Sequence, residues 1–236
     1  MMKKEITVQD VANMIDHSLL RPDITISELK EGCDLAIKYN LISVCARPSD
    51  MDIVCEKLKG SDVLPTTVIS FPHGTCTTET KIFELEDAIS KGAMECDVVM
   101  NIGRFLSGEY DYVVNELTKL AEISHKNNII LKVIFENHYL TDEQIVKACQ
   151  LAKEANVDFI KTSTGYAESG AKMHDLQIMV ANAEGRQVKA AGGVRTLDDC
   201  LSMMAIGVTR VGTRASEDII LEAQKRFEDG TLNIDQ

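Results

Sequence analysis

The chain has 236 residues, 44% of them hydrophobic and 26% charged, a balance typical of a soluble globular protein with its own core. Its formal net charge of −12 excludes nucleic acid as the main partner, because a phosphate backbone needs a basic surface, but it allows a small anionic ligand. No segment approaches the roughly 20 apolar residues of a membrane-spanning helix, so a membrane partner is not expected.

The spacing of cysteine and histidine bears on compartment and on metal binding. The seven cysteines are odd in number and never form a CxxC pair, which favours reduced thiols over a disulfide framework or a zinc site. The five histidines form no HxH or HExxH pair, so no metal site is predicted. The N-terminal MMKKEITVQD has no apolar run after its lysines and is not a secretory signal. We therefore expect a cytoplasmic protein.

Short β-branched runs alternate with amphipathic helical stretches along the chain, after a short helix expected at 8–14. Several helical stretches open on Ser or Thr followed by an acid, as in Thr141-Asp142-Glu143, and several end near glycine, as at Lys91-Gly92. The tail 228–236 is expected to be loose. Strands are predicted at 14–19, 41–46, 66–71, 95–100, 129–135, 158–163, 187–191 and 208–213.

Eight strands alternating with eight helices predict an α/β fold with parallel strands, and this number of repeats is typical of a (β/α)8 TIM barrel. A doubly wound open sheet is the alternative. It usually has a glycine-rich turn after its first strand, and MIDHSLLRPD offers none. No linker interrupts the pattern, so we expect a single-domain barrel over residues 1–236, with a short N-terminal helix.

Five charged residues lie within predicted strands: Asp16, Asp97, Lys132, Lys161 and Lys189. In a barrel, alternate strand residues face inward, and catalytic groups lie at the C-terminal ends of the strands. Lys161 and Lys189 occupy matching heights on consecutive strands. Each buried charge must be paired or must change its protonation state. The five residues therefore form either structural ion pairs or a catalytic centre.

The catalytic interpretation gives the two strand lysines different tasks. An ordinary lysine has a pKa of about 10.4 and is almost entirely protonated at neutral pH. Burial and a neighbouring cation favour the neutral amine. Lys189 would then stay charged while Lys161 is the neutral nucleophile. Such an amine forms a Schiff base with a carbonyl, and its iminium accepts electrons during carbon–carbon bond cleavage. Asp97 would move protons.

Motifs spread over residues 10–215 resemble those of deoxyribose-phosphate aldolases. IDHSLLRPD, VCARPSD, SFPHG, KGAMECDVVMNIG, LKVIFEN with LTDEQ, FIKTSTGY, VKAAGGVRT and GVTRVGT occur in the family's order. The resemblance implies a class I aldolase that needs no metal or other cofactor. Such an enzyme reversibly cleaves 2-deoxy-D-ribose 5-phosphate to acetaldehyde and D-glyceraldehyde 3-phosphate. The expected partners are therefore a small sugar phosphate and an aldehyde, with a homodimer as the candidate assembly.

The resemblance also implies roles for individual residues. Lys161 resembles the Schiff-base lysine, Lys189 the second lysine that favours its neutral form, and Asp97 the aspartate of the proton relay. The remaining matches contribute to the pocket and to the binding of substrate and phosphate: Asp16, Cys45, Lys132, Gly165, Gly192 and Gly193.

The sequence departs from the family pattern where the last strand ends. Family members usually continue as GTSSG, whose serines hold phosphate, whereas this chain has Arg214 and Ala215 there and Ser216 one position later. Arg214 and Ser216 are expected to bind phosphate, because a guanidinium can bind it in a bidentate manner. Arg214 could instead select a carboxylate or another sugar phosphate, or lie on the surface at a helix start. A barrel that binds sugar phosphates without catalysis is a further alternative.

Overall fold

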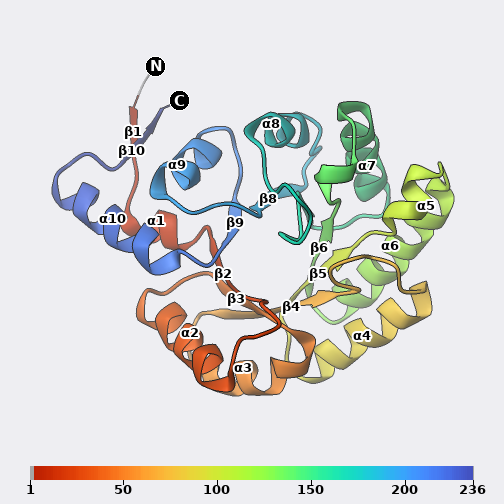
Figure 1. Cartoon of the computed structure of the whole chain (residues 1–236), viewed down its shortest axis with the longest axis horizontal. Helices are drawn as coiled ribbons and strands as arrows, with labels where there is room; N and C mark the ends of the chain where they lie inside the picture. The colour runs from red at the N-terminus through yellow and green to blue at the C-terminus, as the bar shows by residue number, and fades with distance from the viewer. Residues whose placement is uncertain (1–2, 236) are drawn as a thin grey trace.

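Eight parallel strands close into a barrel in the computed structural model, which describes residues 3–235 (Figure 1). The barrel order follows the chain from β2 to β9, so the predicted (β/α)8 architecture is confirmed and the open sheet is wrong. All eight predicted strands are present. Their bounds are β2 (Ile15–Leu19), β3 (Ser43–Ala46), β4 (Leu64–Ile69), β5 (Glu95–Val99), β6 (Ile130–Ile134), β7 (Phe159–Lys161), β8 (Gln187–Ala191) and β9 (Arg210–Thr213).

Helices surround the barrel and connect consecutive strands (Figure 1). The short helix α5 (Ile102–Leu106), which was not predicted separately, precedes α6 (Tyr110–Lys126). The short N-terminal helix is confirmed as α1 (Val8–Ala12). The others are α2 (Ile26–Lys38), α3 (Met51–Leu58), α4 (Thr78–Ser90), α6 (Tyr110–Lys126), α7 (Asp142–Glu154), α8 (Met173–Ala181), α9 (Leu197–Ala205) and α10 (Ser216–Glu228), with 3-10 turns η1 (Pro48–Asp50) and η2 (Asn137–Tyr139).

Threonine caps explain where several of these helices begin. Thr141 precedes α7, its side chain accepts from the backbone N–H of Gln144, and the Gln144 side chain accepts from the backbone N–H of Thr141. This reciprocal capping box satisfies two N–H groups that would otherwise lack partners. Thr25 and Thr196 cap α2 and α9 in the same way. The cap predicted from the sequence at 141–143 is therefore confirmed.

The two ends of the chain pair with each other. β1 (Lys3–Glu5) and β10 (Asn233–Asp235) form an antiparallel pair outside the barrel, in register Lys4 to Ile234. The expectation of a loose tail was therefore wrong. Leu232 and Ile234 are buried in the main core, so apolar burial adds to the strand hydrogen bonds.

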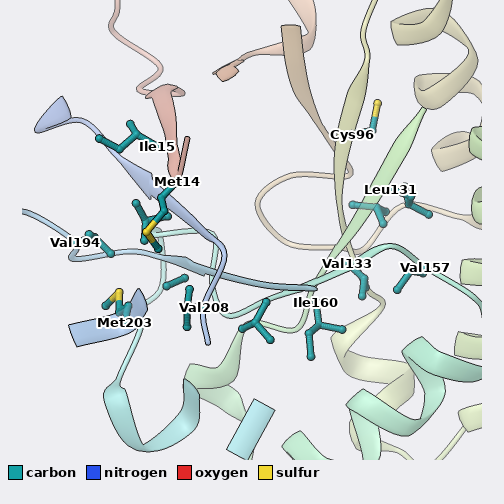
Figure 2. Packing of buried hydrophobic residues seen from close by; sticks show 14 of the residues in the cluster. Met14, Ile15, Cys96, Leu131, Val133, Val157, Ile160, Val194, Met203 and Val208 are labelled. Atoms are coloured by element: carbon teal, nitrogen blue, oxygen red, sulfur yellow. The ribbon is translucent and has the colours of Figure 1, made fainter. Parts of the chain in front are cut away.

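Apolar and charged residues alternate along β5 and around the single charged residues of β6 to β8, and the two sets face opposite sides. Cys96, Leu131, Val133 and Ile160 belong to the buried hydrophobic core (Figure 2). The charged residues between them face the barrel interior. This reverses the usual arrangement, in which branched apolar side chains fill the interior. None of the helices in 3–235 combines the length and apolar character that a membrane crossing requires.

Candidate active site

Lys161, Lys189 and Asp97 meet inside the barrel. The Oδ2 atom of Asp97 accepts hydrogen bonds from Lys161 Nζ at 2.7 Å and from Lys189 Nζ at 2.6 Å. Lys189 also donates to Asp16 Oδ2, so its ammonium lies between two carboxylates. All four side chains are buried, with 3% or less of each exposed. The fold thus brings together four residues that the sequence placed on four separate strands.

Strand register explains why these groups lie at one level. Lys161 on β7 is directly opposite Lys189 on β8, and Asp97 on β5 is directly opposite Lys132 on β6. Because β5 and β8 are not neighbours in the barrel, the Lys189–Asp97 ion pair crosses the interior. The inward direction inferred from strand alternation is therefore correct for these residues.

Electrostatics fix the charge of two members of the group. Burial opposes the charge of Lys189, but Asp16 and Asp97 outweigh this effect and raise its pKa above the ordinary lysine value. Burial also opposes the charge of Asp97, yet Lys132, Lys161 and Lys189 together lower the pKa of its carboxyl well below its usual value. Near neutral pH, Lys189 is therefore a cation and Asp97 an anion.

A second charged layer lies beside this group and was not predicted. Arg210 binds Glu95 through two hydrogen bonds of 2.9 and 3.1 Å, and Lys132 donates to Glu95 at 2.6 Å. Lys132 also donates to Asp97 Oδ1 at 3.0 Å, which joins the two layers. Burial opposes the charge of Glu95, but Lys132 and Arg210 lower its pKa to about 2.

The sequence did contain a signal for this layer. Glu95 precedes Asp97 by two positions and therefore faces the same side of β5. Arg210 lies within the predicted strand 208–213 in the same way. Lys132, which was expected to contact substrate, is fully buried and is not among the residues that line the cavity. Its contacts support the two carboxylates instead.

The charges of the barrel interior can be counted. The two layers contain three carboxylates, Asp16, Glu95 and Asp97, against four basic side chains. Four cations and three anions would leave one excess positive charge in a buried site. Buried charges are costly unless they are paired, and each of the four basic side chains has a carboxylate partner within the two layers.

A cavity of about 870 Å³ opens at the C-terminal ends of the strands, where barrel enzymes place their active sites. Lys161, Lys189, Asp16 and Cys45 line it, whereas Asp97 does not. Further residues line the cavity without having been assigned a role from the sequence. Among them are Ser18, Arg21, Thr164, Tyr166 and Arg195.

Three predicted glycines line one side of this cavity, namely Gly165, Gly192 and Gly193. All three have positive φ angles, of 86°, 84° and 88°, which disfavour other residues. Gly192 also packs against Gly170, where a Cβ on either residue would overlap the backbone of the other. The loops after β7 and β8 therefore approach closely and form a wall of exposed backbone, which suits contact with an anion.

Arg214 and Ser216 have different positions. Arg214 is exposed and lines the cavity, as expected for a residue that contacts the anionic end of a substrate. Ser216 is fully buried and absent from the lining, and its Oγ lies 2.7 Å from Nδ1 of His17. The expected contact of the Ser216 hydroxyl with phosphate is therefore not supported by this geometry, because that hydroxyl is directed at His17.

One group of side chains could in principle hold a metal ion. Asp16, Cys45 and Asp97 offer ligand atoms within 4.8 Å of one another. Burial, followed by the charges of Asp16 and Asp97, raises the pKa of the Cys45 thiol, which disfavours the thiolate that binds metals. Both carboxylates also accept hydrogen bonds from Lys189. These contacts favour an ion-paired organic site over a metal centre.

Known proteins with similar sequences and structures include aldolases. Residues 10–212 match the sequence profile described as DeoC/LacD family aldolase. A deoxyribose-phosphate aldolase of Caldanaerobacter subterraneus is 42% identical over 96% of this chain and 99% of its own length. One from Rhodopirellula baltica is 46% identical over 92% of this chain and 91% of its own. The solved structure "QR15, an Aldolase" superposes with a TM-score of 0.88 at 34% identity, over 93% of this chain and 98% of that one.

Proposed function

Because the chain belongs to the DeoC/LacD family of aldolases, we propose that it reversibly cleaves 2-deoxy-D-ribose 5-phosphate to acetaldehyde and D-glyceraldehyde 3-phosphate. The observation that carries the proposal is the position of Lys161. Its amine lines a cavity, donates to Asp97 at 2.7 Å and lies beside the cationic Lys189. A purely structural core would be filled by apolar side chains, whereas here two lysines share one carboxylate oxygen next to a cavity.

The first step forms a covalent intermediate on Lys161. Its neutral amine attacks the C1 aldehyde of the open-chain sugar, and the carbinolamine then loses water to give an iminium. The fixed positive charge of Lys189 favours the neutral amine at the start, since two adjacent ammonium groups repel each other. Asp97 holds both amines at one oxygen and can pass protons between them.

The second step breaks the bond between C2 and C3. The C3 hydroxyl loses its proton to a basic group, its oxygen forms the new aldehyde, and the bond's electron pair moves to the iminium to give an enamine. Asp16 and Asp97 are the carboxylates available for that proton, and Oδ1 of Asp16 is buried without a hydrogen-bond partner among the described residues. Protonation of the enamine at C2 and addition of water to the iminium then release acetaldehyde and the Lys161 amine.

Arg214 and the glycine wall would bind the phosphate. Gly165, Gly192 and Gly193 provide backbone at one side of the cavity, and Arg214 provides a cation at the same opening. Gly192 and Gly193 follow β8 and Arg214 follows β9, which are the seventh and eighth strands of the barrel, after which barrel enzymes commonly bind phosphate. Cys45 lines the cavity as a protonated thiol and contributes shape rather than charge.

Arg214 also supports a second candidate, a Schiff-base aldolase for another phosphorylated or carboxylated sugar. A guanidinium binds carboxylate and phosphate with similar bidentate geometry. Cleavage rates on 2-deoxyribose 5-phosphate, unphosphorylated 2-deoxyribose and a carboxylated analogue would separate the two. If Arg214→Ala leaves the order of these substrates unchanged, Arg214 has no part in selecting them.

Borohydride trapping tests the chemistry directly. The protein is mixed with 2-deoxyribose 5-phosphate and sodium borohydride, and its intact mass and peptide map are then measured. We expect a two-carbon adduct on Lys161, which reports Schiff-base formation and carbon–carbon cleavage together. An unmodified protein that still binds the sugar phosphate would indicate a non-catalytic barrel.

Domain organisation, cellular location and assembly are properties of the whole chain. We propose one aldolase domain for residues 1–236, because β2 to β9 close a single barrel and the terminal strands pair with each other. All seven cysteines are free thiols, which supports a reducing, cytoplasmic location. A homodimer stays a prediction, which light scattering of the purified protein would test.

A further inference from the structure

A β-bulge at the end of β6 places a buried carboxylate next to the nucleophile strand. Phe135 N–H donates to the Lys161 carbonyl at 3.0 Å, and Asn137 N–H donates to the Thr162 carbonyl at 2.9 Å. Between these two hydrogen bonds the segment after β6 advances by two residues, from Phe135 to Asn137, whereas the segment at the end of β7 advances by only one, from Lys161 to Thr162. The extra residue is Glu136, and bulges of this kind re-aim a side chain and often lie next to active sites.

Glu136 holds a backbone conformation that its residue type rarely adopts. Its φ of 56° and ψ of 65° lie in the left-handed region, which glycine adopts far more readily than glutamate. Its side chain is nevertheless buried, with 2% of the residue exposed. Strained non-glycine residues persist where the surroundings hold them, commonly at functional sites. The energetic cost of this conformation indicates a functional role for the carboxylate.

That carboxylate binds one residue of the loop that follows Lys161. Thr164 N–H donates to both oxygens of Glu136, at 3.3 and 3.2 Å, and the Thr164 hydroxyl donates to Oε2. The Thr164 Oγ1 in turn accepts from Tyr166 N–H at 3.0 Å. These bonds fix the turn 164–166, all three residues of which line the cavity. Within the described residues, the Gly165 N–H between them donates to no protein acceptor.

We propose that Glu136 is a positioning residue, which acts through Thr164 to aim the Gly165 N–H at the anionic end of the substrate. Fixing Thr164 and Tyr166 on either side leaves Gly165 as the only N–H of the turn without an acceptor among the described residues. Gly165 also lies against Gly192, since a Cβ on Gly192 would be in van der Waals contact with Gly165 Cα, at 3.4 Å. A carboxylate that pre-orients this donor improves binding of the anion without contacting the substrate. The proposal rests on the proposed function, because it assumes a phosphorylated substrate.

Glu136→Gly and Glu136→Gln separate the carboxylate from the backbone strain. The glycine variant removes the carboxylate and relieves the left-handed strain, whereas the glutamine variant keeps the length and one acceptor oxygen. Glu184 offers a matched control. It also has a positive φ, of 45°, but it is exposed and precedes β8, at the end of the barrel opposite the cavity. Glu184→Gly thus makes the same chemical change away from the site.

The measurement is kcat and KM on 2-deoxyribose 5-phosphate and on unphosphorylated 2-deoxyribose, with thermal unfolding of each variant. For Glu136→Gly we expect KM for the phosphorylated sugar to rise roughly tenfold or more, while kcat/KM for the unphosphorylated sugar changes less than about twofold. Its unfolding temperature should not fall. The KM of Glu136→Gln for the phosphorylated sugar should lie between those of Glu136→Gly and the wild type. Glu184→Gly should match the wild type on both sugars.

Two results would overturn the proposal. An unchanged preference for the phosphorylated sugar in both Glu136 variants would show that the carboxylate does not serve the anionic end. An equal loss of kcat/KM on both sugars would show that Glu136 supports Lys161 or the fold instead of the anionic end. If Glu136→Gly does not fold, the glutamine variant gives the same comparison. A wild-type protein that neither cleaves nor traps either sugar would instead contradict the proposed function, so the two failures are distinguishable.

Discussion

Lys161 and Lys189 donate to the same atom, Oδ2 of Asp97, from two neighbouring strands. Lys189 is additionally held by Asp16, and these two carboxylates raise its pKa, so Lys189 retains its proton. The geometry thus assigns the amines different tasks, although their sequence environments, IKT and VKA, are similar.

Replacement of Lys161 by arginine should abolish cleavage and trapping. Arginine keeps the positive charge but stays protonated and cannot form a Schiff base. We expect kcat to fall about 10³-fold or more and the borohydride adduct to disappear. The exposed Lys153 provides a control, since Lys153→Arg should leave both unchanged. Near wild-type cleavage by Lys161→Arg would assign the nucleophile to another residue.

Replacement of Lys189 by methionine should weaken both catalysis and folding. Asp16 and Asp97 lose a shared cation, and the loss of one partner of a buried ion pair costs about 3–5 kcal/mol of unfolding free energy. Without the neighbouring charge, protonated Lys161 is less disfavoured, so the rate should reach its maximum at a higher pH. Urea unfolding and a pH–rate profile measure the two effects. A profile that coincides with that of the wild type would remove Lys189 from the control of the nucleophile.

Glu95 should make stability depend on pH in the acid range. Its pKa is about 2 in the folded protein against 4.5 in a model peptide, so its ionised form stabilises the fold above pH 4.5. This contribution is lost as the pH falls toward 2, because the unfolded chain binds the proton first. Between pH 5 and 3 the wild type should lose about 2 kcal/mol relative to Glu95→Gln. Parallel stability curves over that interval would contradict the assignment.

His17 should make folding stability depend on pH at higher pH values than Glu95 does. Burial lowers its pKa to about 4 from 6.5, and its ring contacts Ser216 at 2.7 Å. Stability from the neutral ring is complete above pH 6.5 and decreases as the pH falls toward 4, because only the unfolded chain takes up the proton. Between pH 7 and 5 the wild type should lose about 2 kcal/mol more than His17→Gln in urea unfolding. His73→Gln, at an exposed site, should show the wild-type slope.

Gly170 should tolerate no side chain. A Cβ there would overlap the backbone of Gly192 and push apart the loops after β7 and β8. We expect Gly170→Ala to lower kcat/KM on the phosphorylated sugar by about 10²-fold, because the glycine wall loses its geometry. Gly103 lies in α5, where an added Cβ would lie 3.9 Å from Oδ1 of Asn101, so Gly103→Ala should keep full activity. Full activity in Gly170→Ala would show that the loops can separate without consequence.

Much of the fold followed from local patterns. Alternating apolar runs and capped amphipathic stretches predicted all eight strands, since side-chain period and cap chemistry are properties of short segments. The tail 228–236 was misjudged because its strand pairs with residues 3–5 at the other end of the chain. Its apolar positions, Leu232 and Ile234, are too few to indicate a strand without that partner.

The candidate site, like the fold, combines features that local sequence predicts with contacts that depend on distant segments. The sequence by itself determined the barrel, the inward direction of Lys161, Lys189 and Asp97, and the glycines that follow their strands, because two-residue alternation and turn chemistry are local. Only the tertiary structure decided which charges meet. The Glu95–Arg210 pair, the Ser216 hydroxyl directed at His17 and the Glu136 bulge each join segments distant in the chain. Their contacts depend on strand register and barrel closure, which arise when non-local segments pair and bury their charges together.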